Sequence, residues 1–249
     1  FMNLDLEKMK NEYKHLIDDE ILLNDLVNEV IFGFSEIIDY IKNNKIESIL
    51  EIGCGTGILL NELKKFFPQI QMTGLEPLKS GYEKYQEISI LKKNNKINIV
   101  NGMIENYYSD KKYDLIFSLN VMEHVENWEK YLLNSNKLLN KDGINIVLCP
   151  NYDFPYESHY IIPIIINKKI TKTIFNKKIN YYDSKNNKKG HWEGLNFISK
   201  KNITRFLKTN KLNFYFDNNI SDRILERLLF DKALKKRHGV VSFFAIFIK

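Results

Sequence analysis

Three closely spaced glycines in the first quarter of the chain have the spacing of a nucleotide-binding turn. Gly53, Gly55 and Gly57 follow an apolar run that ends at Ile52. Glycines so close together let the backbone bend sharply, and a ligand can approach the main chain without meeting a Cβ atom. A helix that begins at Gly57 would direct its free N–H groups and the positive end of its dipole toward that ligand. In an open α/β sheet, the end of the first strand is where such ligands bind.

A second candidate ligand group is a carboxylate at the end of the next expected strand. Glu76 lies about 20 residues beyond the glycines, where a carboxylate can accept hydrogen bonds from both hydroxyls of a ribose. Glu76 could instead be an acid at the start of a helix, because Pro77 and Ser80 follow it. The spacing and the position at a strand end favour the ribose.

The glycines and the acid before them form the pattern Glu51-x-Gly53-x-Gly55-x-Gly57, which resembles motif I of the class I S-adenosylmethionine-dependent methyltransferases. A dinucleotide fingerprint would place its third glycine at position 58, which is Ile58, so the spacing disfavours an NAD-dependent dehydrogenase. The segment from Asn120 to Val125, Asn-Val-Met-Glu-His-Val, resembles motif IV of the same family. The resemblance covers residues 45–150 well and the last strands loosely.

This resemblance implies S-adenosylmethionine as the cofactor. In the family, the loop at positions 101–105 brackets the adenine ring, often with an acid that bonds the exocyclic amine. Met103 stands where that acid is common, so backbone groups would have to read the amine edge while Met103 and Ile104 contact the ring. The cofactor-binding residues that the resemblance implies are Glu51, Gly53, Cys54, Gly55, Thr56, Gly57, Glu76, Pro77, Met103, Ile104, Asn120 and Val121.

Three histidines are candidates for a general base. A hydroxyl or amine acceptor loses a proton during methyl transfer, and histidine is often neutral at pH 7 and able to accept it. His124 has the best placement, because motif IV borders the methyl group, although a packing role at the strand end is equally open. His159 and His191 lie in a later, irregular segment, where a structural role is as open as catalysis.

The aromatic and acidic neighbours of those two histidines suggest a polar acceptor pocket. We expect substrate binding by Tyr156, Glu157, Tyr160 and Trp192. We expect no metal, because the sequence has neither an H-x-x-x-H pair nor a C-x-x-C pair, and Glu157 with His159 is a thin basis for a divalent site.

The elements that must position these residues alternate between strands and helices, which predicts right-handed β-α-β units and a parallel sheet. The expected fold class is α/β: a Rossmann-like seven-stranded methyltransferase sheet, mostly parallel with an antiparallel edge pair, plus an N-terminal helical segment and an inserted cap. Expected strands are residues 46–52, 70–76, 97–100, 113–119, 144–149, 212–216 and 240–248. Expected helices are residues 4–17, 23–41, 57–67, 80–94, 128–139, 199–209 and 223–236.

One methyltransferase domain, residues 1–249, is expected to contain four parts: N-terminal helices or a lid (1–44), a cofactor-binding core (45–150), an inserted substrate cap with short helices (151–198) and the C-terminal part of the sheet (199–249). Asp142 and Gly143 are expected to form the turn into the fifth strand. Tyr13 and His15 could fold over the cofactor, but a place on an exposed helix face is the favoured interpretation.

Composition suits one large domain, since 44% of the 249 residues are hydrophobic. No apolar run reaches the roughly 18 residues that span a bilayer, and no signal peptide is visible. The two cysteines, Cys54 and Cys149, predict a reducing compartment, and we expect a cytoplasmic protein. The net charge of +6 comes mostly from lysine and is a weak hint of an anionic partner.

The leading functional prediction is an O-methyltransferase of small molecules. The Pro150-Asn151 closure and the segment Tyr156–Tyr160 resemble bacterial methyltransferases that act on surface-polysaccharide precursors. The lysine-rich stretch 168–189 would suit an anionic acceptor, such as a phosphorylated sugar, or would simply be a solvated face.

Three other functions stay open. Motif IV also fits methylation of a quinone-type or other phenolic acceptor, and a protein that binds the cofactor without transferring the methyl group is a further alternative. Methylation of nucleic acid is disfavoured, because arginine is scarce and an N/D-P-P-Y/F motif is absent. The sequence indicates no oligomeric state.

Overall fold

The computed structural model describes residues 4–77, 97–157, 159–185, 190–217 and 243–248. The chain divides into two compact units. Unit 1 comprises residues 1–117 and 138–143, and unit 2 comprises residues 118–137 and 144–249. The expected helices 80–94 and 223–236 lie outside the described residues.

Seven of the described strands form one sheet in the order β3-β2-β1-β4-β5-β9-β8, and the other two pair separately. Strand β1 pairs in parallel with β2 and β4, and β2 pairs in parallel with β3. Strand β9 is antiparallel to both β5 and β8. The predicted fold class, a mostly parallel sheet with an antiparallel edge pair, is therefore confirmed. The strands are β1 (Ser48–Ile52), β2 (Gln71–Glu76), β3 (Asn98–Asn101), β4 (Tyr113–Leu119), β5 (Leu139–Pro150), β8 (Phe214–Asp217) and β9 (Phe243–Ile248).

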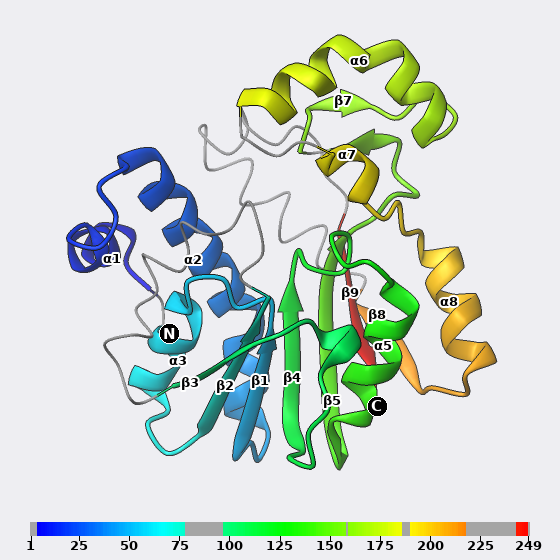
Figure 1. The fold of residues 1–249 in the computed structure, drawn as a ribbon. Helices are drawn as coiled ribbons and strands as arrows, with labels where there is room; N and C mark the ends of the chain where they lie inside the picture. The colour runs from blue at the N-terminus through cyan, green and yellow to red at the C-terminus, as the bar shows by residue number, and fades with distance from the viewer. Residues whose placement is uncertain (1–3, 78–96, 158, 186–189, 218–242, 249) are drawn as a thin grey trace. The chain divides into compact units, whose positions relative to one another are not determined.

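Unit 1 contains the helices α1 (Leu6–Tyr13), α2 (Glu20–Asn43) and α3 (Ile58–Phe66) (Figure 1). Helix α2 begins where Asp19 accepts hydrogen bonds from the backbone N–H groups of Ile21 and Leu22, which have no partner within the helix. Its apolar residues recur at helical spacing and form one buried stripe. A 3₁₀ turn (Ile104–Asn106) follows β3.

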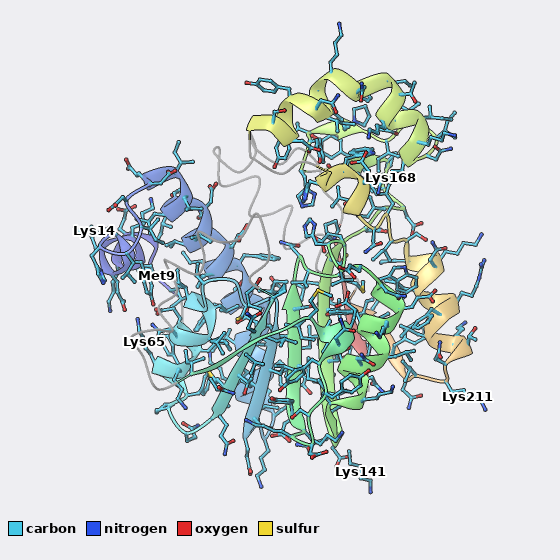
Figure 2. The ribbon with its side chains drawn as sticks, viewed as in Figure 1. Met9, Lys14, Lys65, Lys141, Lys168 and Lys211 are labelled. Atoms are coloured by element: carbon cyan, nitrogen blue, oxygen red, sulfur yellow. The ribbon has the colours of Figure 1, made fainter. Side chains whose placement is uncertain are left out.

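The favoured prediction for Tyr13, an exposed position, is wrong. Its side chain is buried, its hydroxyl donates a hydrogen bond to Glu62, and Asn61 Nδ2 lies 2.8 Å from the same oxygen. Lys65 of α3, labelled in Figure 2, bridges Glu12 of α1 and Glu62. These contacts join α1 to α3, so tertiary packing overrides the surface position that helical spacing favoured. His15 is exposed, as expected.

The predicted turn at Asp142 and Gly143 is also wrong, because both residues lie inside β5. A Cβ atom at Gly143 would lie 2.7 Å from the Tyr113 carbonyl oxygen. Gly143 therefore lies inside a strand at a point where the backbone at Tyr113 comes close, and close backbone approach is a frequent reason for a glycine within a strand.

Unit 2 contains α5 (Trp128–Lys137), α8 (Lys200–Thr209) and the inserted cap. The cap consists of β6 (Tyr156–Glu157), β7 (Ile162–Pro163), α6 (Lys168–Lys185) and α7 (His191–Gly194), which Figure 1 draws together. Helix α6 consists of two shorter helical stretches that meet at Phe175, where the backbone is not helical (φ −102°, ψ 18°).

The cap has a hydrophobic core of its own. Tyr160, Ile162, Ile179, Trp192 and Leu195 form one buried cluster. Phe197 packs against this cluster and stacks on Tyr152 with ring centres 4.5 Å apart. An internal core explains how the described part of segment 151–198, between β5 and α8, keeps a defined structure.

Both cysteines are free and buried. Among the described residues, we find no helix with the length and apolar character that a membrane crossing requires.

Gly74 provides a test of packing beneath the glycine turn. A Cβ atom at position 74 would lie 2.3 Å from Ile99 Cδ1 and 2.5 Å from Cys54 Sγ. We expect Gly74→Ala to lower the free energy of unfolding by about 1–3 kcal/mol, as overpacking does. Urea unfolding measures the change. The control is Gly194→Ala, where a Cβ atom would meet nothing within 4 Å, and an equal loss in both variants would contradict the prediction.

Candidate functional site

The glycine turn in unit 1 adopts the conformation that requires glycine. Gly53, Gly55 and Gly57 have φ angles of 71°, 52° and 75°, in the left-handed region. The backbone N–H of Gly53 donates to the Leu75 carbonyl (2.7 Å), and that of Gly57 donates to the Cys54 carbonyl (2.8 Å). Helix α3 begins immediately afterwards, so its N-terminal N–H groups lie at the turn.

Glu76, the last residue of β2, is held against this turn. Its carboxylate is 6% exposed, and Oε2 accepts a hydrogen bond from the backbone N–H of Gly55 (2.9 Å). An ionised carboxylate accepts several hydrogen bonds at once, so Glu76 can hold the turn and also bind ligand hydroxyls.

Glu51, on β1, has a buried carboxyl group with an oxygen atom that is unpartnered within the described part of the chain. Its side chain is 5% exposed, and Oε2 has no hydrogen-bond partner among the described residues. Burial and, to a smaller extent, the charge of Glu76 raise the pKa of Glu51 to about 8. A buried carboxyl group without a partner is costly in the absence of a ligand. Glu51 is therefore suited to a ligand that brings a positive charge or a hydrogen-bond donor.

The other predicted cofactor residues of unit 1 lie in the turn itself, directly after β2 and in the loop after β3. Cys54 and Thr56 are buried within it, and Pro77 directly follows Glu76. In the loop after β3, Met103 is partly exposed and Ile104 is buried. Glu105 is a buried acid two residues beyond Met103. We gave it no role from the sequence, because the family's acid is aligned with Met103.

In unit 2, Asn120 at the end of β4 has an unusual backbone conformation. Its φ angle is 54°, which is uncommon for a residue other than glycine. Its Oδ1 atom is buried without a hydrogen-bond partner among the described residues. Strain and an unpaired polar atom often coincide at ligand-binding positions. Val121, the next residue, is partly exposed.

The three histidines predicted as candidate bases come together in unit 2. The ring centres of His124 and His159 are 5.0 Å apart, those of His124 and His191 are 5.1 Å apart, and those of His159 and His191 are 5.6 Å apart. All three side chains are partly exposed. Together these residues, which we call the histidine cluster, form a group that could hold a metal ion, although the sequence spacing predicted none.

Glu157 supports the histidine cluster from within the protein. Its carboxylate is fully buried, and Oε1 lies 2.7 Å from Nδ1 of His159. Oε2 accepts a hydrogen bond from the backbone N–H of Tyr160. Burial alone would raise the pKa of Glu157, but the hydrogen bond with His159 and its charge bring that pKa below its usual value. Glu157 therefore orients His159, and its predicted role in substrate binding stays a prediction.

Glu123 is a second buried carboxyl group beside the cluster. Its Oε1 lies 3.8 Å from His124 Nε2, and its Oε2 accepts from the Cys149 thiol (3.6 Å). Burial raises the pKa of Glu123 to about 7. The sequence analysis gave no role to this residue, although its place beside His124 in motif IV was visible.

The predicted aromatic substrate residues have different positions. Tyr160 and Trp192 belong to the hydrophobic core of the cap, and the Tyr160 hydroxyl donates to Asp183 (2.6 Å). The structure assigns both side chains to the cap interior instead of an exposed binding surface. Tyr156 is partly exposed, so it keeps the role of a candidate substrate contact.

Several cap lysines stabilise the cap itself. Lys168, labelled in Figure 2, donates hydrogen bonds to the carbonyl oxygens of Glu193 (2.8 Å) and Leu195 (2.6 Å). Lys172 pairs with Glu193, and Lys178 donates to the Ile161 carbonyl. These contacts account for part of the lysine-rich stretch without an anionic ligand.

Comparisons with known proteins agree with this fold. A family model described as a methyltransferase domain matches residues 22–214. An uncharacterised protein of Mycobacterium tuberculosis is 30% identical over 196 residues, which are 77% of this chain and 66% of that protein. A ubiquinone biosynthesis O-methyltransferase of Rickettsia conorii is 34% identical over 128 residues, which are 51% of this chain and 42% of that enzyme. The chain thus spans less than two thirds of these curated relatives.

Two solved structures show the same fold. The plantazolicin methyltransferase BpumL, in complex with a monoazolic desmethylPZN analog and SAH, has a TM-score of 0.54 at 18% identity over 98% of this chain and 89% of that chain. The YcgJ protein from Bacillus subtilis has a TM-score of 0.54 at 13% identity over 88% of this chain and 98% of that chain. Because the family model matches well over half of the residues, this chain belongs to the methyltransferase domain family.

Proposed function

We propose that the protein transfers the methyl group of S-adenosylmethionine to a hydroxyl oxygen of a small molecule. The observation that carries this proposal is the buried Glu51 carboxylate beside the left-handed glycine turn. S-adenosylmethionine brings a sulfonium and an ammonium group, and both cations suit this carboxylate. NAD would bring an anionic pyrophosphate to the glycine turn beside Glu51, which is unfavourable.

Different residues of unit 1 would bind different parts of the cofactor. Glu76 would accept the ribose hydroxyls, Met103 and Ile104 would contact the adenine, and Glu51 would face the cationic methionine end. Support for these roles comes from membership of the methyltransferase family and from the geometry of the turn. For Asn120 and Val121, the motif IV resemblance implies a role in binding the methionine part.

Methyl transfer is an in-line displacement, and its rate depends mainly on holding the acceptor oxygen, the methyl carbon and the sulfur in one line. The acceptor oxygen forms a bond to the methyl carbon, the carbon–sulfur bond breaks, and its electron pair stays on sulfur. The acceptor proton must pass to a base. Within the histidine cluster, the Glu157 contact favours His159, because a Nδ1–H that donates to a carboxylate leaves Nε2 able to accept a proton.

For the acceptor, we propose a polar hydroxyl compound. A sugar precursor of a surface polysaccharide is the acceptor that the resemblance of segment 156–160 suggests. A phenolic, quinone-type acceptor is the second candidate, favoured by the relatives that act in ubiquinone biosynthesis. An anionic group on the acceptor has less support, since Lys168, Lys172 and Lys178 have partners within the cap.

Calorimetry and product analysis test the proposal in two steps. We expect the purified protein to bind S-adenosylmethionine and S-adenosylhomocysteine and not to bind NAD. With a panel of sugar nucleotides, neutral sugars and catechols, we expect acceptor-dependent formation of S-adenosylhomocysteine. Binding without turnover for every acceptor class would favour a non-catalytic cofactor-binding protein, and failure to bind either adenosyl compound would refute the proposal.

A further inference from the structure

We infer that His124, His159 and His191 form a binding site for one divalent transition-metal ion, for which zinc is the best match. The site lies entirely in unit 2, and its existence does not depend on the proposed methyl transfer. The inference rests on three independent features: the spacing of the rings, the buried carboxylates behind them and the chemistry of the three ligands.

The spacing of the three rings matches that of imidazoles around a metal. Three imidazoles bound tetrahedrally to zinc, with zinc–nitrogen bonds of about 2.0–2.1 Å, place their ring centres about 5 Å apart. The three observed separations are 5.0, 5.1 and 5.6 Å. One ring nitrogen from each histidine lies within 4.8 Å of the other two. Metal binding would draw these nitrogens together to about 3.3 Å, which small rotations of the partly exposed side chains can achieve.

Each ligand comes from a separately fixed segment. The backbone N–H of His124 donates to the Val121 carbonyl (2.8 Å) in the turn after β4. His159 follows β6, and its ring is held by Glu157. His191 is the first residue of α7 and follows Gly190, whose φ angle is 79°. Two backbone constraints and one side-chain contact therefore bring the three histidines together, as in a preorganised metal site.

Glu157 supplies the outer-shell contact typical of such sites. Metal-bound histidines almost always donate their second ring N–H to a carboxylate or carbonyl, which fixes the tautomer and ring orientation. Oε1 of Glu157 lies 2.7 Å from Nδ1 of His159, so this contact directs Nε2 of His159 toward the ion.

The local charge also favours a cation. Glu123 and Glu157 are both fully buried, and their ion-pair contacts are with His124 and His159. A buried carboxylate is costly unless a positive charge compensates it. A divalent ion held by three neutral imidazoles would compensate both carboxylates.

The ligand set defines the class of ion. Imidazole ligands suit zinc, copper, iron and nickel, whereas magnesium and calcium prefer oxygen ligands. Three protein ligands leave one tetrahedral position for water or another oxygen ligand. If the proposed function holds, an acceptor hydroxyl could occupy that position and lose its proton more readily, in place of proton transfer to a free histidine.

Metal titration of the chelator-treated full-length protein tests the site. We expect one equivalent of Zn²⁺ to bind by calorimetry, and one equivalent of Co²⁺ to give the visible absorption of a tetrahedral site that Zn²⁺ then abolishes. His159→Ala and His191→Ala should lose the Co²⁺ spectrum. Glu157→Gln should keep the spectrum but weaken affinity about 10–100-fold, as changes to outer-shell partners do.

The matched control is His15→Ala, which removes an exposed histidine from unit 1 and should bind Co²⁺ like the unchanged protein. Circular dichroism establishes that each variant is folded, and Glu157→Gln provides a second measurement should an alanine variant unfold. Absence of stoichiometric binding, or an unchanged Co²⁺ spectrum in both alanine variants, would overturn the inference. Loss of cofactor binding with intact Co²⁺ binding would refute the proposed function and leave the metal site standing.

Discussion

Replacement of Glu76 by alanine should weaken S-adenosylmethionine binding by at least a hundredfold. The carboxylate ends β2, and its Oε2 accepts the Gly55 N–H at 2.9 Å, so the group is already held at the ligand turn. Each hydrogen bond from a ribose hydroxyl to a charged acceptor is worth about 1.5–3 kcal/mol, and two such bonds account for a loss of this size. Isothermal titration calorimetry with S-adenosylmethionine and S-adenosylhomocysteine measures it.

Two further variants isolate the role of the Glu76 carboxylate. Glu76→Gln keeps the shape of the side chain and one acceptor oxygen. We therefore expect its cofactor affinity to lie between that of the unchanged protein and that of Glu76→Ala. Glu47→Ala removes an exposed carboxylate that pairs with Lys45 just before β1, and it should bind the cofactor normally. Cofactor affinity in Glu76→Ala within threefold of the unchanged protein would exclude Glu76 from the ribose site.

Glu51→Gln should make the ligand-free protein more stable at pH 8 while it weakens cofactor binding. Burial raises the pKa of Glu51 from 4.5 to about 8 in the folded state. Between these values the folded state binds more protons than the unfolded state, so stability falls as the pH rises from about 4.5 to 8. By this linkage the ionisable group costs up to about 4 kcal/mol at pH 8, and glutamine removes the titration.

Urea unfolding of both proteins between pH 5 and pH 8.5 measures this effect. We expect the two stabilities to be similar near pH 5 and to diverge steadily toward pH 8. The pH dependence is the decisive quantity, because a buried glutamine adds a constant cost of its own. Parallel stability curves would show that Glu51 titrates normally. An unchanged affinity for S-adenosylmethionine would show that its carboxylate does not meet the cationic end of the cofactor.

The sequence by itself determined the sheet and the glycine turn, because both depend on local signals. Three glycines at alternate positions permit the left-handed φ angles that the turn contains, and apolar runs bounded by turn residues predict strands. Tyr113–Leu119 was predicted at its observed bounds, and β2 was predicted to within one residue. The antiparallel edge pair was predicted from the family resemblance and not from these local signals.

Only the tertiary structure decided what the individual side chains of the cap and the N-terminal helix do. The sequence favoured an exposed helix face for Tyr13, whereas in the structure its hydroxyl bonds to Asn61 and Glu62 of α3. Tyr160 and Trp192 have the composition of a binding pocket, but they fill the cap core. In each case the deciding neighbour is far away in sequence, so no local pattern reports it.

The histidine cluster is the clearest case of a site that local sequence patterns do not report. Its members are more than 30 residues apart in the chain, and a search for metal-binding spacing tests only ligands that are close in sequence. The folding of the turn after β4, the β6 segment and α7 brings their ring nitrogens within 4.8 Å of one another. Local backbone requirements are readable from residue types, whereas a site made from separate segments exists only once long-range packing has brought them together.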